Sequence, residues 1–279
     1  MTISIVTDSN AQLPPELAER FGIEVVPLTV TVDGVAYLEG VDLDADDFYS
    51  RFERGGSPVV ATSQPSPGRF ADAYQRLADG GATEILSVHI GSSVSGTVNA
   101  ARLAAGDATV PVRVVDTGTA SFAVALCAWA SAEAIAAGAT LDEAATAAAR
   151  VSATVGNVFV VRALDLARAG GRLAPTMELG SDEIAVLTLT GGVMRTLGYA
   201  RDLDGAAGAM AVHVRSSGTG LRVGVGVADA GTEPLAEALA SRLQDAAEVS
   251  ELVRYRIGPS VGAHTGPGTV GTMFVPIGS

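Results

Sequence analysis

A corner of small hydroxyl residues and glycines is the part of this chain best suited to chemistry. The stretch Gly91-Ser-Ser-Val-Ser-Gly-Thr-Val-Asn-Ala100 follows an apolar run that is typical of a buried parallel strand, and it opens an alanine-rich helix. The first amides of a helix lack internal partners and carry partial positive charge, so the corner can hold an anion. Further donors are the hydroxyls of Ser92, Ser93, Ser95 and Thr97. From the corner alone, a serine that caps the helix is the simpler explanation.

A second candidate is His264, in the glycine-rich segment Val261-Gly-Ala-His-Thr-Gly-Pro-Gly268. Glycines permit close backbone approach and positive φ angles, so we expect a loop that holds this histidine for a functional purpose. His89, inside a strand, and His213, on a helix, fit structural positions better. None of the three stands at metal-ligand spacing from another histidine or from the cysteine, so we expect no metal site.

The composition opposes several kinds of function. All 18 basic residues are arginine, which removes the lysine of phosphate-binding loops, Schiff bases and pyridoxal phosphate enzymes. The net charge of −13 opposes contact with nucleic acids and with anionic lipid surfaces. We therefore expect no nucleic acid partner and no stable insertion into a membrane.

The single cysteine and the apolar segments indicate a cytoplasmic protein. Cys127 cannot form an internal disulfide, and we expect it to be a small buried hydrophobic residue. The apolar residues 123–137 are interrupted by Ser131 and Glu133 and are too few to span a membrane. Because the chain enters a strand directly after Met1, we expect no secretory leader.

Strands and helices alternate in the first half of the chain, and the pattern changes in the second. This alternation predicts a parallel sheet, whose carboxyl-end loops meet at one edge where ligands bind. From about Asn157, paired strands with helices predict an α+β domain. We predict an α/β protein with an N-terminal parallel-sheet α/β domain, residues 1–156, followed by a C-terminal α+β domain, residues 157–279.

One early segment predicts an irregular strand. Residues 23–32 are rich in β-branched side chains and predict one strand, bent or at an edge because of Pro27. Asp33-Gly34 then predicts a tight hairpin to residues 35–38.

Several segments together resemble the DegV family of bacterial fatty-acid-binding proteins, over nearly the whole chain. The residues that carry the resemblance are Ile5-Val-Thr-Asp-Ser9, Val25-Val-Pro-Leu28, Thr62-Ser-Gln-Pro-Ser-Pro-Gly68, Ser95-Gly-Thr97, Leu164 through Gly170-Gly-Arg172 and Gly262-Ala-His-Thr-Gly-Pro-Gly268. The Thr-Ser-Gln-Pro block and the Gly-Ala-His-Thr-Gly-Pro-Gly block, in this order, are specific.

The resemblance implies a non-catalytic carrier with no cofactor, which binds a long-chain fatty acid in a buried tunnel at the domain junction. By the same resemblance, the head group would be bound by Thr62, Ser92 or Ser95, and His264. Supporting loop residues would be Ser63, Gly96, Thr97, Thr265 and Gly266. Arg172 matches the arginine that family members use toward a partner fatty acid kinase, and Arg201 stands at a position that is usually basic.

Departures from the family pattern keep two alternatives open. Ile184-Ala185 replaces a Lys-Pro pair that is usual near the kinase side, so a lipid sensor without a kinase is one alternative. The other is a hydrolase or acyltransferase with Ser92 or Ser95 as nucleophile and His264 as base. It lacks an acid placed by the sequence to orient the histidine, and no Gly-x-Ser-x-Gly motif supports it.

Overall fold

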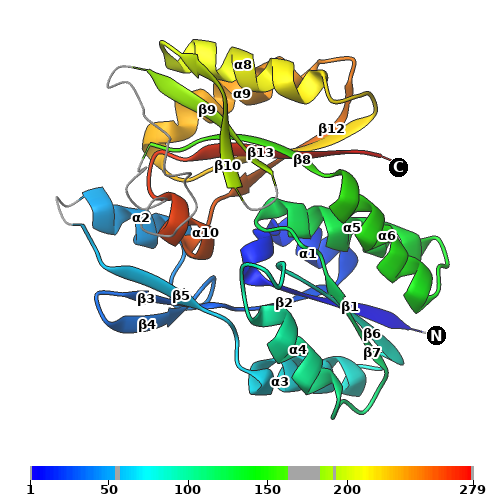
Figure 1. The fold of residues 1–279 in the computed structure, drawn as a ribbon. Helices are drawn as coiled ribbons and strands as arrows, with labels where there is room; N and C mark the ends of the chain where they lie inside the picture. The colour runs from blue at the N-terminus through cyan, green and yellow to red at the C-terminus, as the bar shows by residue number, and fades with distance from the viewer. Residues whose placement is uncertain (1, 54–56, 163–182, 191–192, 278–279) are drawn as a thin grey trace. The chain divides into compact units, whose positions relative to one another are not determined.

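The computed structural model describes residues 2–53, 57–162, 183–190 and 193–277 (Figure 1). These residues form two compact units. The first contains residues 1–43 and 59–154, and the second contains residues 44–58 and 155–279. The division into domains 1–156 and 157–279 stays a prediction, because a compact unit is not by itself a domain that folds alone.

The first unit is built on a four-stranded sheet in which every pair of neighbours is parallel, as predicted. Its strands, in the order β2-β1-β6-β7, are β1 (Ile3–Asp8), β2 (Ile23–Val26), β6 (Glu84–His89) and β7 (Val112–Asp116). The helices are α1 (Pro15–Phe21), α3 (Pro67–Asp79), α4 (Thr97–Ala105), α5 (Phe122–Ala136) and α6 (Leu141–Thr154), with a 3-10 turn η1 (Ser9–Ala11). Helices α3 and α4 cover one face of the sheet, and α5 and α6 cover the other (Figure 1). This α/β architecture confirms the predicted fold class.

A small antiparallel sheet, β4-β3-β5, completes the first unit. Its strands are β3 (Thr29–Val32), β4 (Val35–Leu38) and β5 (Val60–Ser63). The predicted hairpin is confirmed, since Asp33 and Gly34 take the positive φ angles, 51° and 84°, that a two-residue turn requires.

The prediction of one strand over residues 23–32 is wrong. β2 and β3 are separate strands in different sheets, because Pro27 has no amide hydrogen to continue the first ladder. Strand β5 was not predicted at all, although it carries Thr62.

The second unit contains a six-stranded mixed sheet in the order β10-β9-β8-β13-β11-β12. The strands are β8 (Gly156–Val160), β9 (Ile184–Thr190), β10 (Val193–Ala200), β11 (Leu221–Val227), β12 (Val249–Arg256) and β13 (Val270–Pro276). The helices are α2 (Ala45–Glu53), α8 (Leu203–Arg215), α9 (Glu233–Gln244) and α10 (Pro259–Thr265), with a 3-10 turn η2 (Ala230–Thr232).

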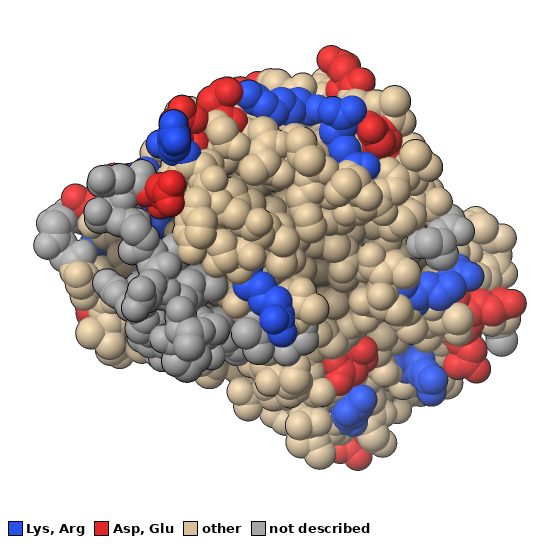
Figure 2. Space-filling model, turned by 45° about the horizontal axis from the view of Figure 1, so that its top comes forward, with Lys and Arg blue, Asp and Glu red and all other residues tan. Residues whose placement is uncertain are grey.

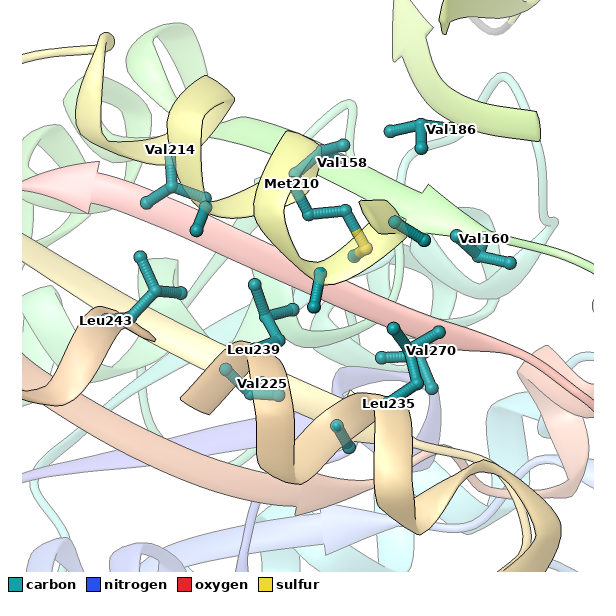
Figure 3. Packing of buried hydrophobic residues seen from close by; sticks show 14 of the residues in the cluster. Val158, Val160, Val186, Met210, Val214, Val225, Leu235, Leu239, Leu243 and Val270 are labelled. Carbon is teal, nitrogen blue, oxygen red and sulfur yellow. The ribbon is translucent and has the colours of Figure 1, made fainter. Parts of the chain in front are cut away.

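Helices α8 and α9 pack on one face of this sheet through branched and small side chains (Figure 3). Met210 and Leu239 point from the helices toward Val225 and Val270 on the strands, and all four side chains are fully buried. The predicted helix over residues 164–169 lies outside the residues that the structure describes.

Candidate functional site

The corner between β6 and α4 is a tight turn that ends in a hydroxyl pair. The carbonyl of Gly91 accepts hydrogen bonds from the amides of Val94 (3.0 Å) and Ser95 (3.1 Å). The Ser95 and Thr97 hydroxyls lie 2.8 Å apart, and Ser95 Oγ also accepts from the Thr97 amide at 3.3 Å. Two hydroxyls with at least one proton to spare therefore stand where helix α4 begins.

The simple capping explanation for these serines does not describe the corner. The N-cap of α4 is Gly96, which has no side chain to satisfy the first-turn amides. Of the first amides of the helix, Ser95 Oγ accepts from that of Thr97, the first helical residue. The amide-rich start of α4 therefore keeps its capacity for an anion.

Ser92 and Ser95 differ in what they contact. Ser92 is exposed, and its amide donates to the Asp116 carboxylate at 3.1 Å. Partial burial acts to raise the pKa of Asp116, but hydrogen bonds from the Ser92 hydroxyl and from the amides of Gly118 and Ser92, together with the nearby Arg102 charge, bring it below its ordinary value. The Ser92 hydroxyl is thus engaged by a carboxylate of the protein, which would repel a second carboxylate. Ser95 is half-buried, and its hydroxyl is hydrogen-bonded to the neutral Thr97 hydroxyl.

Thr62 lies on β5, half-buried, opposite Val30 of β3 in the small sheet. Two residues on, Gln64 meets the corner: a side-chain carbon added to Gly96 would lie 3.0 Å from the carboxamide carbon of Gln64. The Gln64 side chain is therefore a close neighbour of the Ser95–Thr97 turn within the first unit. Gln64 is not among the site residues predicted above, although it belongs to the Thr-Ser-Gln-Pro block. Ser63 is exposed.

His264 belongs to the second unit and lies on a helix, so the expected glycine-rich loop is wrong. Pro259 suits the first turn of α10, and His264 is half-buried in its last turn. Gly266 ends the helix with φ 70°, its amide donating to Gly262 at 2.7 Å, and the Thr265 hydroxyl donates to the Val261 carbonyl. The glycines therefore serve the helix and its end.

Helix α10 rests on the aromatic side chains of α2. Phe48 and Tyr49 are buried and in edge-to-face contact, with ring centres 5.1 Å apart. A side-chain carbon on Gly262 would lie 2.5 Å from the Tyr49 oxygen, so glycine is what lets the two helices approach. Beside them, Arg256 of β12 pairs with Asp46 of α2. The position of His264 therefore depends on α2.

Of the two arginines predicted to contact a kinase, the structure describes one, Arg201. Arg172 lies outside the residues that the structure describes. Arg201 is exposed between β10 and α8, directly before Asp202, which caps α8. Figure 2 shows several arginines beside acidic side chains, in keeping with ion pairs such as Arg215–Glu248 (3.0 Å).

Over the described ranges, no three histidine, cysteine, aspartate or glutamate side chains gather closely enough to hold a metal ion. Likewise, none of the helices in the described part of the chain is both long and apolar enough to cross a membrane.

Comparison with known proteins shows which proteins this chain is similar to, independently of the geometry described above. The family model described as "Uncharacterised protein, DegV family" matches residues 2–277. A DegV domain-containing protein of Streptomyces coelicolor is 38% identical over 275 residues, 97% of each chain. A solved structure on fatty acid binding of a DegV family protein from Thermus thermophilus has a TM-score of 0.85 and 31% identity, covering 99% of this chain and 100% of that chain. A Thermotoga maritima protein, whose structure is described as revealing a fatty acid binding function, has a TM-score of 0.86 and 28% identity, with coverage of 99% and 100%.

Proposed function

Because this chain belongs to the DegV family, we propose that it binds a long-chain fatty acid and presents the carboxyl group to a partner kinase. The observation that carries the proposal is the hydroxyl pair of Ser95 and Thr97 at the uncapped start of α4. A carboxylate taken out of water needs several donors, and hydroxyls with helix amides supply them. Similarity to solved proteins described as binding fatty acids supports the ligand class.

Within this proposal, Ser95 rather than Ser92 takes the head group, because Ser92 already serves Asp116. Thr62 and His264 would join Ser95, and Gln64, Ser63, Gly96, Thr97, Thr265 and Gly266 would support them. Ser95→Ala should weaken fatty acid binding about tenfold, as expected for the loss of one hydrogen bond to a charged group. Ser92→Ala is the matched control and should leave affinity unchanged. Equal losses in the two variants would remove the distinction between these serines.

Native mass spectrometry of the purified protein, with lipid identification after denaturation, tests the ligand. We expect one fatty acid per chain. A protein that carries no lipid and binds none of a series of added fatty acids would contradict the proposal.

The second part of the proposal is that a partner kinase phosphorylates the bound fatty acid. Phosphorylation of the carboxyl group would consume ATP, so the proposal includes a cytoplasmic location for the protein. Arg201, which is exposed, would contact the kinase together with Arg172. Arg201→Ala should then reduce copurification of a kinase that converts the bound acid to its acyl phosphate, while fatty acid binding stays intact. Arg215→Ala, in which the lost arginine is paired with Glu248, is the control. Fatty acid binding without any copurifying kinase would favour a lipid sensor.

A further inference from the structure

A chain of buried polar side chains lies beneath the corner and is not used by the proposed binding site. It runs from Tyr74 of α3 through Ser87 and His89 of β6 to Asp8 at the end of β1. The Tyr74 and Ser87 hydroxyls are 2.8 Å apart, Ser87 Oγ and His89 Nε2 are 2.5 Å apart, and His89 Nδ1 and Asp8 Oδ2 are 2.9 Å apart. The exposed fractions of these four residues are 0% or 1%.

The fold brings these residues together across three elements. Strands β1 and β6 are parallel with Thr7 opposite Val88, so Asp8 and His89 end the two strands side by side. Ser87 and His89 share one face of β6, on which α3 lies, and Phe70 of α3 packs edge-on against the His89 ring at 4.9 Å.

The donors and acceptors of these side chains determine which group donates in each hydrogen bond. Asp8 accepts from His89 Nδ1, which leaves Nε2 to accept from Ser87 in the neutral imidazole, and Ser87 accepts from Tyr74. Burial raises the pKa of Tyr74 to about 12, against a smaller opposite effect of its bond to Ser87, so its hydroxyl keeps its proton. The arrangement has the order of a serine–histidine–aspartate triad, yet Ser87 is closed to solvent and substrate. It is therefore no hydrolase site.

Asp8 also holds the two loops above it. Its carboxylate accepts from the amide of Asn10 (3.1 Å), in the loop after β1, and from the amide of Ile90 (3.1 Å), at the start of the corner. Ile90 adjoins Gly91, whose carbonyl fixes the Ser95 amide. An unbroken series of covalent and hydrogen bonds thus runs from His89 through Asp8 to the Ser95–Thr97 turn.

We propose that the buried pair His89–Asp8 is a positioning device for the Ser95–Thr97 hydroxyls, and that it sets how tightly the chain holds a carboxylate. This inference rests on the proposed fatty acid binding for its ligand, though not for the positioning itself. His89 touches no ligand. It holds the Asp8 carboxylate in an orientation that lets the two oxygens accept from the Asn10 and Ile90 amides.

Two substitutions separate the two hydrogen bonds of the His89 imidazole, one to Asp8 and one to Ser87. His89→Asn keeps an amide group near the Nδ1 position, facing Asp8, and gives up the contact with Ser87. His89→Gln keeps a polar group near the Nε2 position, facing Ser87, and leaves Asp8 without its imidazole donor. Affinities are measured for a fatty acid and for the fatty alcohol of the same length, which shares the acyl chain but carries no charge.

We expect His89→Gln to weaken binding of the acid about tenfold more than binding of the alcohol, and His89→Asn to change this ratio little. In the ligand-free protein, amide hydrogen exchange at Val94 and Ser95 should be faster in His89→Gln than in His89→Asn, after correction for global stability. Should His89→Gln not fold, Asp8→Asn takes its place in the same comparison.

Equal acid-to-alcohol ratios and equal exchange rates in the two variants would overturn the inference, since a merely structural role predicts that both ligands weaken together. If the wild-type chain binds no fatty acid, the proposed function fails. The exchange rates at Val94 and Ser95 then still decide the positioning role.

Discussion

Replacing Gly262 by alanine should push α10 away from α2. The added carbon would lie 2.5 Å from the Tyr49 oxygen and 2.8 Å from Phe48 Cε1. The exposed fractions of Phe48 and Tyr49 are 0% and 2%, so neither ring can turn into solvent. Overpacking of this kind costs about 1–3 kcal/mol, against a gain of about 1 kcal/mol for alanine over glycine in a helix. The free energy of unfolding should therefore fall by about 0–2 kcal/mol.

Gly208 of α8 provides the matched control, because a carbon added there would meet nothing within 4 Å and it belongs to the same compact unit. Gly208→Ala should gain only the helix propensity, about 1 kcal/mol. The two variants should then differ by about 1–3 kcal/mol, or roughly 2–12 °C in Tm by calorimetry of the full chain.

The affinity for a fatty acid is the second measurement that should separate Gly262→Ala from Gly208→Ala. Since His264 lies on α10, Gly262→Ala should also weaken fatty acid binding, whereas Gly208→Ala should not. Equal Tm values for the two variants, or a Gly262→Ala protein more stable than wild type, would refute the claim that the α2 rings leave no room.

Three further outcomes follow from single buried or shielded groups. Thr272 of β13 is fully buried and its hydroxyl has no hydrogen-bond partner among the described residues, so Thr272→Val should raise the free energy of unfolding by about 1–2 kcal/mol in urea titration; a loss would mean that the hydroxyl is satisfied. Burial raises the pKa of Cys127 to about 12, so at pH 8 about one thiol in ten thousand is ionised, and alkylation should be negligible until denaturant is added; rapid native labelling would contradict this. The pKa of Asp116 is below its ordinary value, so its ionised form stabilises the folded state above that value and loses this contribution as pH falls through the lowered pKa. Amide exchange of Ser92 and Gly118 should therefore accelerate only below about pH 4, judged against the rate expected for unprotected amides, and an acceleration beginning near neutral pH would argue against it.

Local sequence signals predicted the parts of the fold that depend on neighbours in the chain. The β3–β4 hairpin follows from Asp33-Gly34, which take the positive φ angles of a two-residue turn. The β6 strand and the turn into α4 follow from an apolar run that ends in glycine and serine. Each of these signals lies within a few residues of the element it specifies.

Features that depend on distant partners could not be predicted in this way. The sequence predicts that His89 is a structural histidine inside a strand, and the structure confirms this. Its hydrogen-bond partner Asp8, however, is 81 positions away in the chain. β5 is a strand because β3 offers an edge to pair with, not because of its own four residues. For His264, the glycines suggested a loop because their use, room for the Tyr49 ring at Gly262, is visible only when α2 is in place. The Ser95–Thr97 corner was predictable as a corner, but the contact with Gln64 that joins it to β5 was not.

Large rings in the second unit are seated on glycines: a carbon added to Gly156 would lie 2.1 Å from the Phe274 ring, and one added to Gly226 would lie 2.3 Å from the Tyr255 ring. Gly262 beneath Tyr49 follows the same rule. A glycine inside a strand or helix lowers its intrinsic stability, and a ring packed over the bare backbone returns apolar burial at the same position. The seat at Gly262 differs from the other two in carrying a candidate ligand residue, His264, two positions away. Disrupting the contact at Gly262 should therefore weaken fatty acid binding. Disrupting the contact at Gly156 or Gly226 should mainly lower the free energy of unfolding.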